Sequence, residues 1–547
     1  MKRRHWLRKP RTVVLAAAVL LGTSTTGCGM FSDSPEPQPE SEPACIRDKT
    51  PYSLGPDTYA EVGKLGDARG NGRPFVTVFD EQHASRIGQV EIAMMLNRLY
   101  HTANLRNLAL EGSIIEKPRP NLAWFTSKPD ARLRADVALQ LLREGEVSAA
   151  EFAAMALPGF QLHPIEHENE HQVDLPDAAT RSYTSYMVAI AVMSMTDSQA
   201  TQAEALLKQG KNEDVIKFII DSNPWTKERY ELYMRKAPVV TTEEMQKLGT
   251  ELEDKARQVG ADVSEYRDGL QAARKFFDTA TQRSSTMAAA TADIATARMG
   301  ECAPIAMNIG AAHSSQVAGL FGHKNVSYAV VSPSSLETGT TIGNGSMALP
   351  VYERKVKGQS VDPAGGIGAF LDGRRKPPLA SQNEWFKAKA ELGYGTAVIA
   401  SAAAAAGGSG MQPPFGLDQK QLGLGGSGLD APSISIDLST IRIRPVQDNG
   451  TTRNDVIFQV TLLKQKTALW IRAGAFAAQP GAHDEKLTLQ QSLEQALKKM
   501  REELKNEPPT DDPPTSGQPK VAEIVPGIKA AVATSEEAAA AVKLSPS

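Results

Sequence analysis

The chain has 547 residues, with 60 Lys and Arg against 63 Asp and Glu and a formal net charge of -3. This balance gives no positive field to attract phosphate groups, so we expect no nucleic-acid partner. The three cysteines are too few for a disulfide-stapled scaffold or a Cys-rich zinc module. A hydrophobic fraction of 41% is typical of a globular protein, here long enough for more than one domain.

The N-terminus has the pattern of an export signal. Lys and Arg residues precede a short apolar run over 12–21, which is shorter than the roughly 20 residues that a spanning helix needs. Small residues then precede Cys28, so the segment 1–27 resembles a bacterial lipoprotein signal after which Cys28 is acylated. The segment 28–44 is expected to be a tether. We therefore expect a bacterial envelope protein that is anchored to the membrane by lipid and faces the periplasm, and that lies in the outer membrane if the cell is Gram-negative. An ordinary secretory signal is the alternative.

Two cysteines remain after Cys28, and the expected compartment is oxidising. Cys45 and Cys302 could form a disulfide that ties the start of the fold to a segment deep in the sequence. A loop of that length contributes about 4–5 kcal/mol in the chain-entropy model. An inert buried thiol at Cys302 is the alternative, and the sequence leaves both interpretations open.

The segment 45–393 begins with the pattern of an α/β domain. Residues 74–79 and 105–110 are nearly continuous apolar runs, which are typical of strands buried on both faces. Between them, over 86–100, apolar residues recur at helical spacing. A helix of this length can connect two parallel strands, so the pattern predicts a β–α–β unit.

Helical patterns occupy the segment from 131 to about 299. Strand patterns return at 304–309 and 326–331, with a helix expected over 314–320 between them. One strand pair therefore opens the domain and another closes it. We predict the α/β class, with a mainly parallel sheet flanked by helices and a large helical insertion.

The character of the sequence changes after residue 393. The segment 394–432 is rich in Ala, Gly and Ser and is expected to be a linker. Alternating apolar residues and an Asn-Gly turn signal then predict a small β-rich module over 433–506 that ends in an amphipathic helix. The segment 507–547 is rich in Pro, Thr, Ala and Glu, and like the N-terminus it is expected to be disordered.

Acidic and imidazole side chains follow three of the predicted strands. Glu81 and His83 come where the first buried strand ends, and they share a face of an extended segment. Glu111 ends the second strand, and His313 follows the strand at 304–309. Ligands of open parallel sheets bind beyond the carboxyl ends of the strands. We therefore expect these four side chains to meet at one edge, beside glycines that permit close approach of the backbone.

Three short motifs lie at these positions: Asp80-Glu81-Gln82-His83, Glu111-Gly112 and Gly310-Ala311-Ala312-His313. They resemble the motifs of the superfamily of erythromycin esterase, ChaN and TraB/Tiki proteins, and the similarity covers residues 70–335. The helix around Arg283 is similar to the family's Arg-Asp-x-x-Met helix, although Ser284 replaces the usual Asp. Asp80 replaces the usual Gly and adds a negative charge that could alter the preference for a metal or a substrate.

The resemblance implies one of two hydrolytic mechanisms, on a small-molecule or peptide substrate. In the esterase branch, His83 would be the general base, with Glu81 or Glu111 as its orienting group or a second base. His313 and Arg283 would stabilise the oxyanion. In the Tiki branch, His83, His313 and Glu81 would bind a divalent metal that activates water. A serine hydrolase is not expected, because no Gly-x-Ser-x-Gly motif surrounds a plausible nucleophile.

Two other classes of function stay open. Some ChaN-like relatives are lipoproteins associated with haem or iron, which makes haem the alternative cofactor. Tyr183, Tyr186 and Met187 lie on a predicted helix and have side chains that can bind haem iron, although residues at this spacing are usually core packing. The third class is an envelope scaffold that keeps the fold without the activity.

A histidine cluster lies within the predicted helical insertion. His163, His167 and His171 recur at every fourth position and would form a metal-binding stripe on a helix. Pro164 and the dense charge around them favour a solvated loop instead. Glu166 is a candidate to line the crevice at the edge of the sheet.

Overall fold

The computed structural model describes residues 52–117, 122–128, 131–170, 175–209, 212–234, 242–338, 351–352, 355, 386, 390, 393–395, 397–398, 434–448, 451–462, 467–472 and 487–505. The expected signal, tether and C-terminal tail, most of the expected linker, and both Cys28 and Cys45 lie outside the described residues. None of the helices in the described ranges is long and apolar enough to span a membrane.

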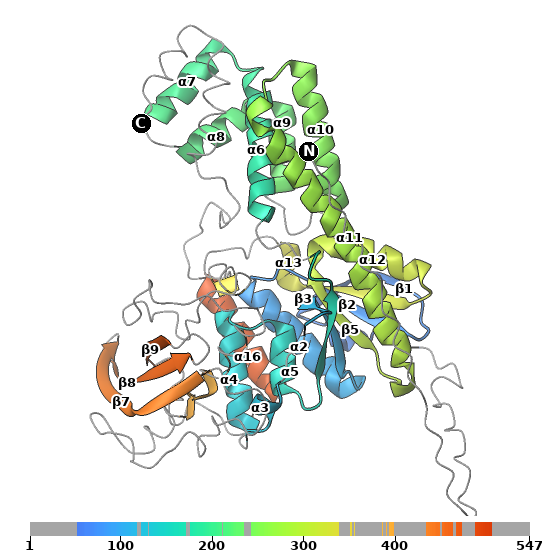
Figure 1. Ribbon diagram of the computed structural model, residues 1–547, viewed down its shortest axis with the longest axis vertical. Coiled ribbons are helices and arrows are strands. Elements are labelled where there is room, and N and C mark those ends of the chain that lie inside the picture. Colours follow the sequence, from blue (N-terminus) through green and yellow to red (C-terminus); the bar gives the residue numbers. More distant parts are fainter. Residues whose placement is uncertain are drawn as a thin grey trace, which may run out of the picture. The chain divides into compact units, whose positions relative to one another are not determined.

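A six-stranded sheet forms the centre of the α/β domain (Figure 1). Its spatial order is β1-β6-β2-β5-β3-β4, and neighbouring strands are parallel except for the edge pair of β1 and β6. The α/β class with a mainly parallel sheet is therefore confirmed. The strands are β1 (Gly63–Arg69), β2 (Phe75–Glu81), β3 (Asn107–Ile114), β4 (Gln161–Glu166), β5 (Ile305–Gly310) and β6 (Ser327–Pro333).

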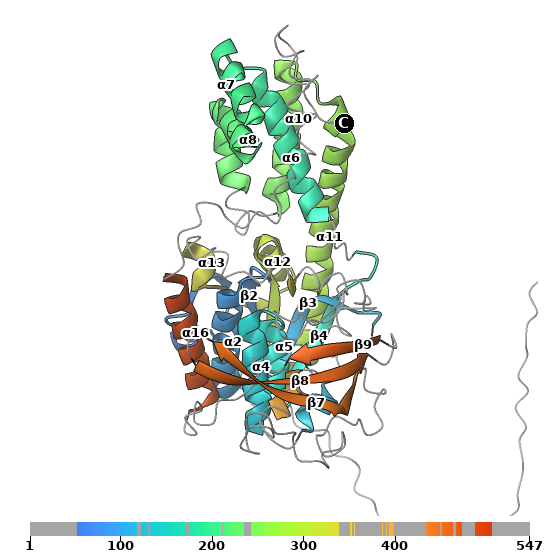
Figure 2. The ribbon, with the colours of Figure 1, turned by 90° about the vertical axis from the view of Figure 1, so that its left-hand side faces the viewer.

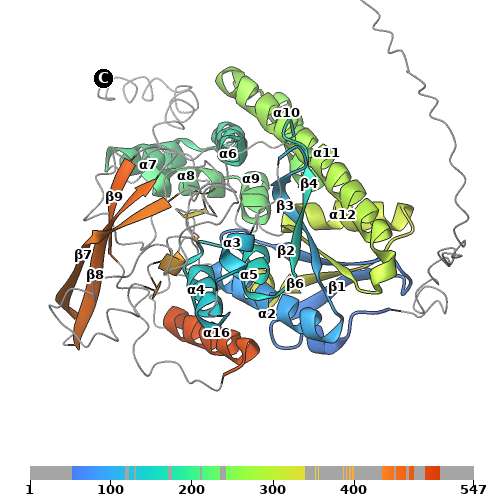
Figure 3. The same cartoon turned by 60° about the horizontal axis from the view of Figure 1, so that its bottom comes forward.

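Helices cover both faces of this sheet. Figure 3 shows α11 and α12 along one side and α2, α4, α5 and α16 along the other. Phe79 and Val78 of β2 are fully buried in different hydrophobic clusters, as expected for a strand that is covered on both faces. These helices are α2 (Arg86–Thr102), α4 (Ala131–Glu144), α5 (Ala149–Ala156), α11 (Arg267–Ala297), α12 (Ala311–His323) and α16 (Leu489–Lys505).

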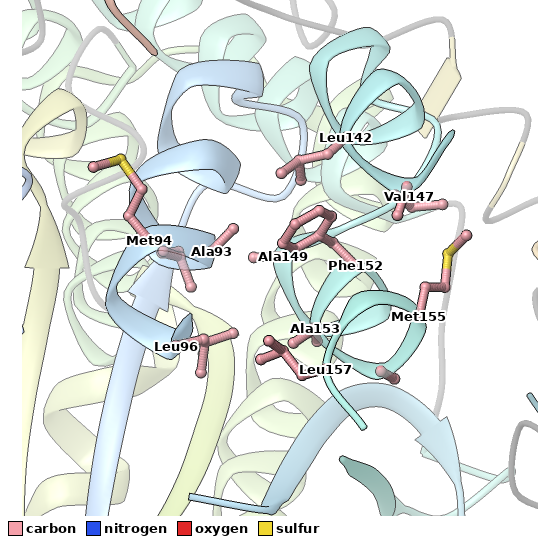
Figure 4. Packing of buried hydrophobic residues seen from close by; sticks show 14 of the residues in the cluster. Ala93, Met94, Leu96, Leu142, Val147, Ala149, Phe152, Ala153, Met155 and Leu157 are labelled. Carbon is pink, nitrogen blue, oxygen red and sulfur yellow. The ribbon is translucent and has the colours of Figure 1, made fainter. Parts of the chain in front are cut away.

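Helices α2 and α5 pack through small residues. Ala93 and Leu96 of α2 lie opposite Ala149, Phe152 and Ala153 of α5 (Figure 4). Alanines allow the two helix backbones to approach closely, and the phenyl ring fills the remaining space. The shorter helices of this domain are η1 (Pro56–Thr58), α3 (Ala123–Thr126), η5 (Met299–Glu301) and α13 (Ser334–Thr338).

The insertion between β4 and β5 is a helical bundle with its own core (Figure 2). The long helix α11 joins it to the sheet, because one end packs on α6 and α10 and the other lies against β4. The remaining elements are α6 (Leu175–Val192), α7 (Asp197–Lys208), α8 (Asn212–Asp221), α9 (Pro224–Arg229), a π-helical turn η2 (Tyr230–Met234), α10 (Thr242–Val259) and η4 (Ser264–Tyr266).

The candidate haem ligands lie in the core of this bundle. Tyr183, Tyr186 and Met187 are buried among other apolar side chains. The Tyr183 hydroxyl donates a hydrogen bond of 2.8 Å to the carbonyl oxygen of Met245. These three residues therefore pack the core of the bundle rather than lining an open ligand site.

Strand β4 corrects two expectations from the sequence. The segment from 131 to 299 is not helical throughout, because β4 pairs in parallel with β3. His163 is part of this strand rather than of a loop, and its Nε2 lies 2.9 Å from Asn107 Oδ1. Proline lacks a backbone N–H and is tolerated in edge strands, which have a neighbouring strand on one side only. β4 is an edge strand, so it can contain Pro164.

The C-terminal region contains a three-stranded antiparallel sheet, as the alternating pattern predicts. The amphipathic helix α16 packs on α2, with Leu493, Leu497 and Met500 in the core of the α/β domain. Arg501 Nη2 also lies 2.6 Å from Oε1 of the fully buried Glu91 of α2. This placement differs from the expected 433–506 module, which grouped the helix with the strands. The strands are β7 (Ile434–Asp448), β8 (Thr451–Leu462) and β9 (Thr467–Arg472).

Cys302 follows η5 and is disulfide-bonded. Its partner lies outside the described residues. Pairing with Cys45 therefore stays a prediction.

Candidate functional site

The carboxyl ends of β2, β3 and β5 bring the four predicted side chains together. Glu81 is opposite Gly310 in the register of β2 and β5, and His313 lies in the first turn of α12 directly after β5. His83 Nε2 lies 3.7 Å from Glu111 Oε2. His313 Nε2 lies 3.5 Å from Glu111 Oε1. The structure thus places Glu111 between two imidazole rings.

Glu81 holds His83 in a fixed orientation. Its Oε1 accepts a hydrogen bond of 2.7 Å from Nδ1 of His83. Its Oε2 accepts from the side-chain amides of Gln89 at 2.7 Å and Asn308 at 2.8 Å. A carboxylate can only accept, so Nδ1 of His83 carries a proton and Nε2 is left for chemistry. Gln89 is itself fixed by the backbone N–H of Ala149, which donates to its Oε1 at 2.7 Å.

Glu111 is held by the backbone of β5. Its Oε2 accepts a hydrogen bond of 2.6 Å from the Gly310 N–H. A Cβ at position 310 would lie 3.1 Å from His83 Nε2 and 3.5 Å from Glu111 Oε2. Glycine therefore permits the close approach at this position that the sequence suggested.

Arg283 of α11 joins Glu111 to Glu166 at the end of β4. Its Nη2 lies 2.9 Å from an oxygen of each carboxylate. The Gly112 N–H also donates to Glu166 at 3.1 Å, and Gly112 has a φ of 78° where the register of β3 and β4 shifts between Leu110 and Ile114. Glu166 lines the site, as the sequence suggested, and is fully buried.

Ser284, the residue after Arg283, contacts the second imidazole. Its Oγ lies 2.8 Å from Nδ1 of His313. Ser284 is fully buried, so its hydroxyl cannot reach a substrate as a nucleophile. Its contact with His313 therefore orients the ring.

Asp80 does not join the cluster. Successive side chains of a strand point to opposite faces, so Asp80 is on the other side of β2 from Glu81. Its Oδ2 lies 3.3 Å from Ser314 Oγ of α12, whose hydroxyl also lies 2.9 Å from the carbonyl oxygen of Ala311. Asp80, which stands where the superfamily that the motifs resemble usually has Gly, is therefore a contact to α12.

Tyr352 is a member of the site that the sequence did not reveal. Its ring stacks on the imidazole of His83, with ring centroids 5.5 Å apart and planes 8° apart. Burial raises the pKa of the Tyr352 hydroxyl, and the carboxylates of Glu111 and Glu81 raise it further. The hydroxyl therefore stays protonated. No motif surrounds this residue, so nothing in the sequence pointed to it.

His167 lies apart from the cluster. Its Nδ1 is 2.6 Å from Glu116 Oε1, and both side chains are nearly half exposed. His171 lies outside the described residues. With His163 bonded to Asn107 in the core, the three-histidine stripe does not form.

The two imidazoles of the site have opposite electrostatic environments. Burial disfavours a positive charge on His83, but the carboxylates of Glu111 and Glu81 outweigh burial and Arg283, raising its pKa to about 9. The pKa of His313 is lowered, chiefly by burial. The charges of Arg283 and His83 lower it too, and the carboxylates of Glu111 and Glu166, which act to raise it, are too weak to reverse this. Its place in the first turn of α12 also disfavours a positive charge. At neutral pH His83 is therefore an imidazolium and His313 a neutral imidazole.

Glu111 carries the negative charge between these two rings. Burial acts to raise its pKa, but His313, His83, Arg283 and the Gly310 N–H lower the pKa to about 2. Its side chain is only 7% exposed, whereas that of His83 is 32% exposed. Of this pair, His83 is thus the group that meets solvent.

The described part of the chain does not fit a divalent metal. Among these residues, no group of three or more His, Cys, Asp and Glu side chains is arranged to hold one. Both oxygens of Glu81 accept hydrogen bonds from side chains, and Arg283 already supplies a positive charge to Glu111 and Glu166. The set His83, His313 and Glu81 is therefore not supported as a metal centre.

Comparisons with protein-family models, curated proteins and solved structures found no match to this chain. The relation to the erythromycin esterase, ChaN and TraB/Tiki superfamily therefore stays a resemblance that rests on short motifs.

Proposed function

We propose that this protein is a hydrolase in which His83 is the general acid and His313 the general base, on either side of Glu111. The substrate would be an ester or an amide of a small molecule or peptide. The observation that carries the proposal is the pair of imidazoles whose Nε2 atoms lie 3.7 and 3.5 Å from the two oxygens of one carboxylate. When the surroundings raise the pKa of one titratable group and lower that of another, the first can donate a proton and the second can accept one at the same pH.

The proposed reaction uses each group in the form that its environment favours. His313 Nε2 accepts a proton from a water molecule, whose oxygen attacks the carbonyl carbon of the substrate. The bond to the leaving group breaks, and His83 gives the proton of Nε2 to that group. His83 ends neutral and His313 ends charged, so a proton must pass from His313 to His83 to reset the site. Glu111, which lies between them, stabilises the charge on either ring.

This assignment differs from the roles that the resemblance implies. There, His83 would be the base and Arg283 would stabilise an oxyanion. An imidazole with a pKa of about 9 is mostly protonated near pH 7 and is a poor base in that form. Arg283 Nη2 donates to Glu111 and Glu166, so its charge is already compensated by buried carboxylates.

The pH dependence of turnover separates these assignments. An acid must be protonated, so we expect kcat/KM to fall as the pH rises through about 9. A base must be neutral, so kcat/KM should also fall at acid pH, below the ordinary His value, because the pKa of His313 is lowered. A panel of esters and amides would first be screened for a substrate that the protein cleaves, and the pH profile would then be measured on that substrate.

Variants show whether that turnover belongs to this site. His83→Gln and His313→Gln should each reduce kcat by about 100-fold or more, whereas His167→Gln, in the exposed pair with Glu116, should not. A rate that rises tenfold per pH unit up to about pH 9 and then levels off would make His83 the base. If both site variants cleave the panel substrate as fast as the wild type, this site does not catalyse the reaction.

The location remains part of the proposal. The signal pattern before Cys28 supports a lipid-anchored protein of the bacterial envelope that faces the periplasm. A scaffold without activity is the alternative function that would fit the same location.

A further inference from the structure

We propose that Ser284 sets the tautomer of His313, so that Nε2 carries the lone pair that accepts a proton. Ser284 is then a positioning residue, because it acts through His313 and touches no substrate. The catalytic consequence rests on the proposed function, whereas the tautomer itself does not.

The hydrogen bonds of Ser284 carry this assignment. Its Oγ donates to the carbonyl oxygen of Ala280, one turn earlier in α11, at 3.1 Å. A hydroxyl has one hydrogen, and a carbonyl oxygen can only accept. With that hydrogen on the bond to Ala280, the 2.8 Å contact between Oγ and Nδ1 of His313 is a bond that Nδ1–H donates. A neutral imidazole with a proton on Nδ1 has its lone pair on Nε2.

The surroundings of Nε2 agree with a proton acceptor. Nε2 lies 3.5 Å from Glu111 Oε1, which is longer than a hydrogen bond between these atoms. Glu111 Oε1 already accepts from Arg283, and Glu111 Oε2 accepts from the Gly310 N–H. A water that lies beside both acceptors can donate one hydrogen to each of them, and one of these hydrogens then points at the general base. Ser284 thereby selects the nitrogen that faces Glu111.

A hydroxyl at this position has a different effect from a carboxylate. A carboxylate would also accept from Nδ1–H, but its negative charge would favour the imidazolium form of His313. Ser284 fixes the same tautomer without that charge, so His313 can stay neutral. The Ser that replaces the family's usual Asp is therefore suited to an imidazole that works as a base.

The test compares Ser284→Ala with Ser285→Ala in the full chain. Ser285 is a matched control, because its Oγ also donates to the carbonyl oxygen one turn earlier, at 3.3 Å, but it is exposed and does not contact His313. The ring-nitrogen NMR shifts of histidine-labelled protein report the tautomer, and His313→Gln assigns the signal. We expect the Nδ1–H form in the wild type and in Ser285→Ala.

In Ser284→Ala, Nδ1 loses its partner, so we expect His313 to change to the Nε2–H form, which can donate to Glu111. On the panel substrate, kcat should fall about 100-fold with KM nearly unchanged, and Ser284→Thr, which keeps the hydroxyl, should restore it. The inference would be overturned if His313 carries its proton on Nε2 in the wild-type protein, or if its tautomer does not change in Ser284→Ala. The expected tautomers in a protein that cleaves no panel member would instead contradict the proposed function alone.

Discussion

Replacing Arg283 with Met is expected to destabilise the fold by about 3–5 kcal/mol, because it removes the cation that lies between two buried carboxylates. Arg283 Nη2 lies 2.9 Å from both Glu111 and Glu166, whose side chains are 7% and 0% exposed. Methionine fills much of the same volume, so the loss of stability comes from removing the positive charge rather than from creating a cavity. Urea unfolding at pH 7 measures the effect.

The pH dependence of the loss identifies its cause. In Arg283→Met, burial would raise the folded-state pKa of Glu166 above its unfolded value, whereas Glu111 keeps the attraction of His83 and the Gly310 N–H, which lower its pKa. The folded variant then binds more protons than the unfolded chain, so its stability should rise as the pH falls from 8 to 5. Arg274→Met on the same helix is the control, because its pair with Glu253 is partly exposed and should contribute about 1 kcal/mol or less. Equal losses in the two variants would contradict the account.

Replacing Glu111 with Gln is expected to reduce kcat/KM by about 1,000-fold near pH 7, within the range of general acid–base effects. The charge of Glu111 is the largest single cause that raises the pKa of His83, and Glu81 raises it through a hydrogen bond and through its charge. Without that charge the pKa of His83 should fall, so less of the imidazolium is available to donate a proton. Arg283 keeps Glu166 as a partner, so the fold should survive.

The control for this variant is Glu116→Gln. Glu116 also lies within 2.6 Å of an imidazole, that of His167, but the pair is exposed. The pH profile provides the specific readout, because the alkaline limb near pH 9 should move to lower pH in Glu111→Gln and stay in Glu116→Gln. A limb that does not move in Glu111→Gln would show that Glu111 does not set the pKa of His83.

The central part of the fold could be predicted because its strands are buried on both faces. The apolar runs at 74–79, 105–110, 304–309 and 326–331 match β2, β3, β5 and β6. β4 was missed because its six residues, Gln161–Glu166, include His163, Pro164 and Glu166, whose burial depends on partners from β3 and α11. β1 was missed because it is mostly exposed and has no apolar run.

Long-range packing also limited the sequence-based description. The helix α16 was assigned to the β-rich module because it follows β9 along the chain. Its apolar residues instead complete the core beside α2, nearly 400 residues earlier. An amphipathic pattern shows that a helix has a buried face, but it does not say which part of the chain covers that face.

The site was predicted in part, for a geometric reason. Strand ends in a parallel sheet share an edge, which is enough to place Glu81, His83, Glu111 and His313 near one another. Arg283 came from the resemblance alone, and Tyr352 had no signal. The difference between the two imidazoles arises from burial and from distances to Glu111, Arg283 and Glu166, which a sequence does not contain.

The most direct test of this account is the titration of His83 and His313 by NMR in the wild-type protein with labelled histidine rings, assigned with His83→Gln and His313→Gln. The measurement needs no substrate. The account predicts that His83 titrates near pH 9 and that His313 titrates below the ordinary His value of about 6.5. Two histidines that both titrate near 6.5, or in the reverse order, would contradict the division into an acid and a base.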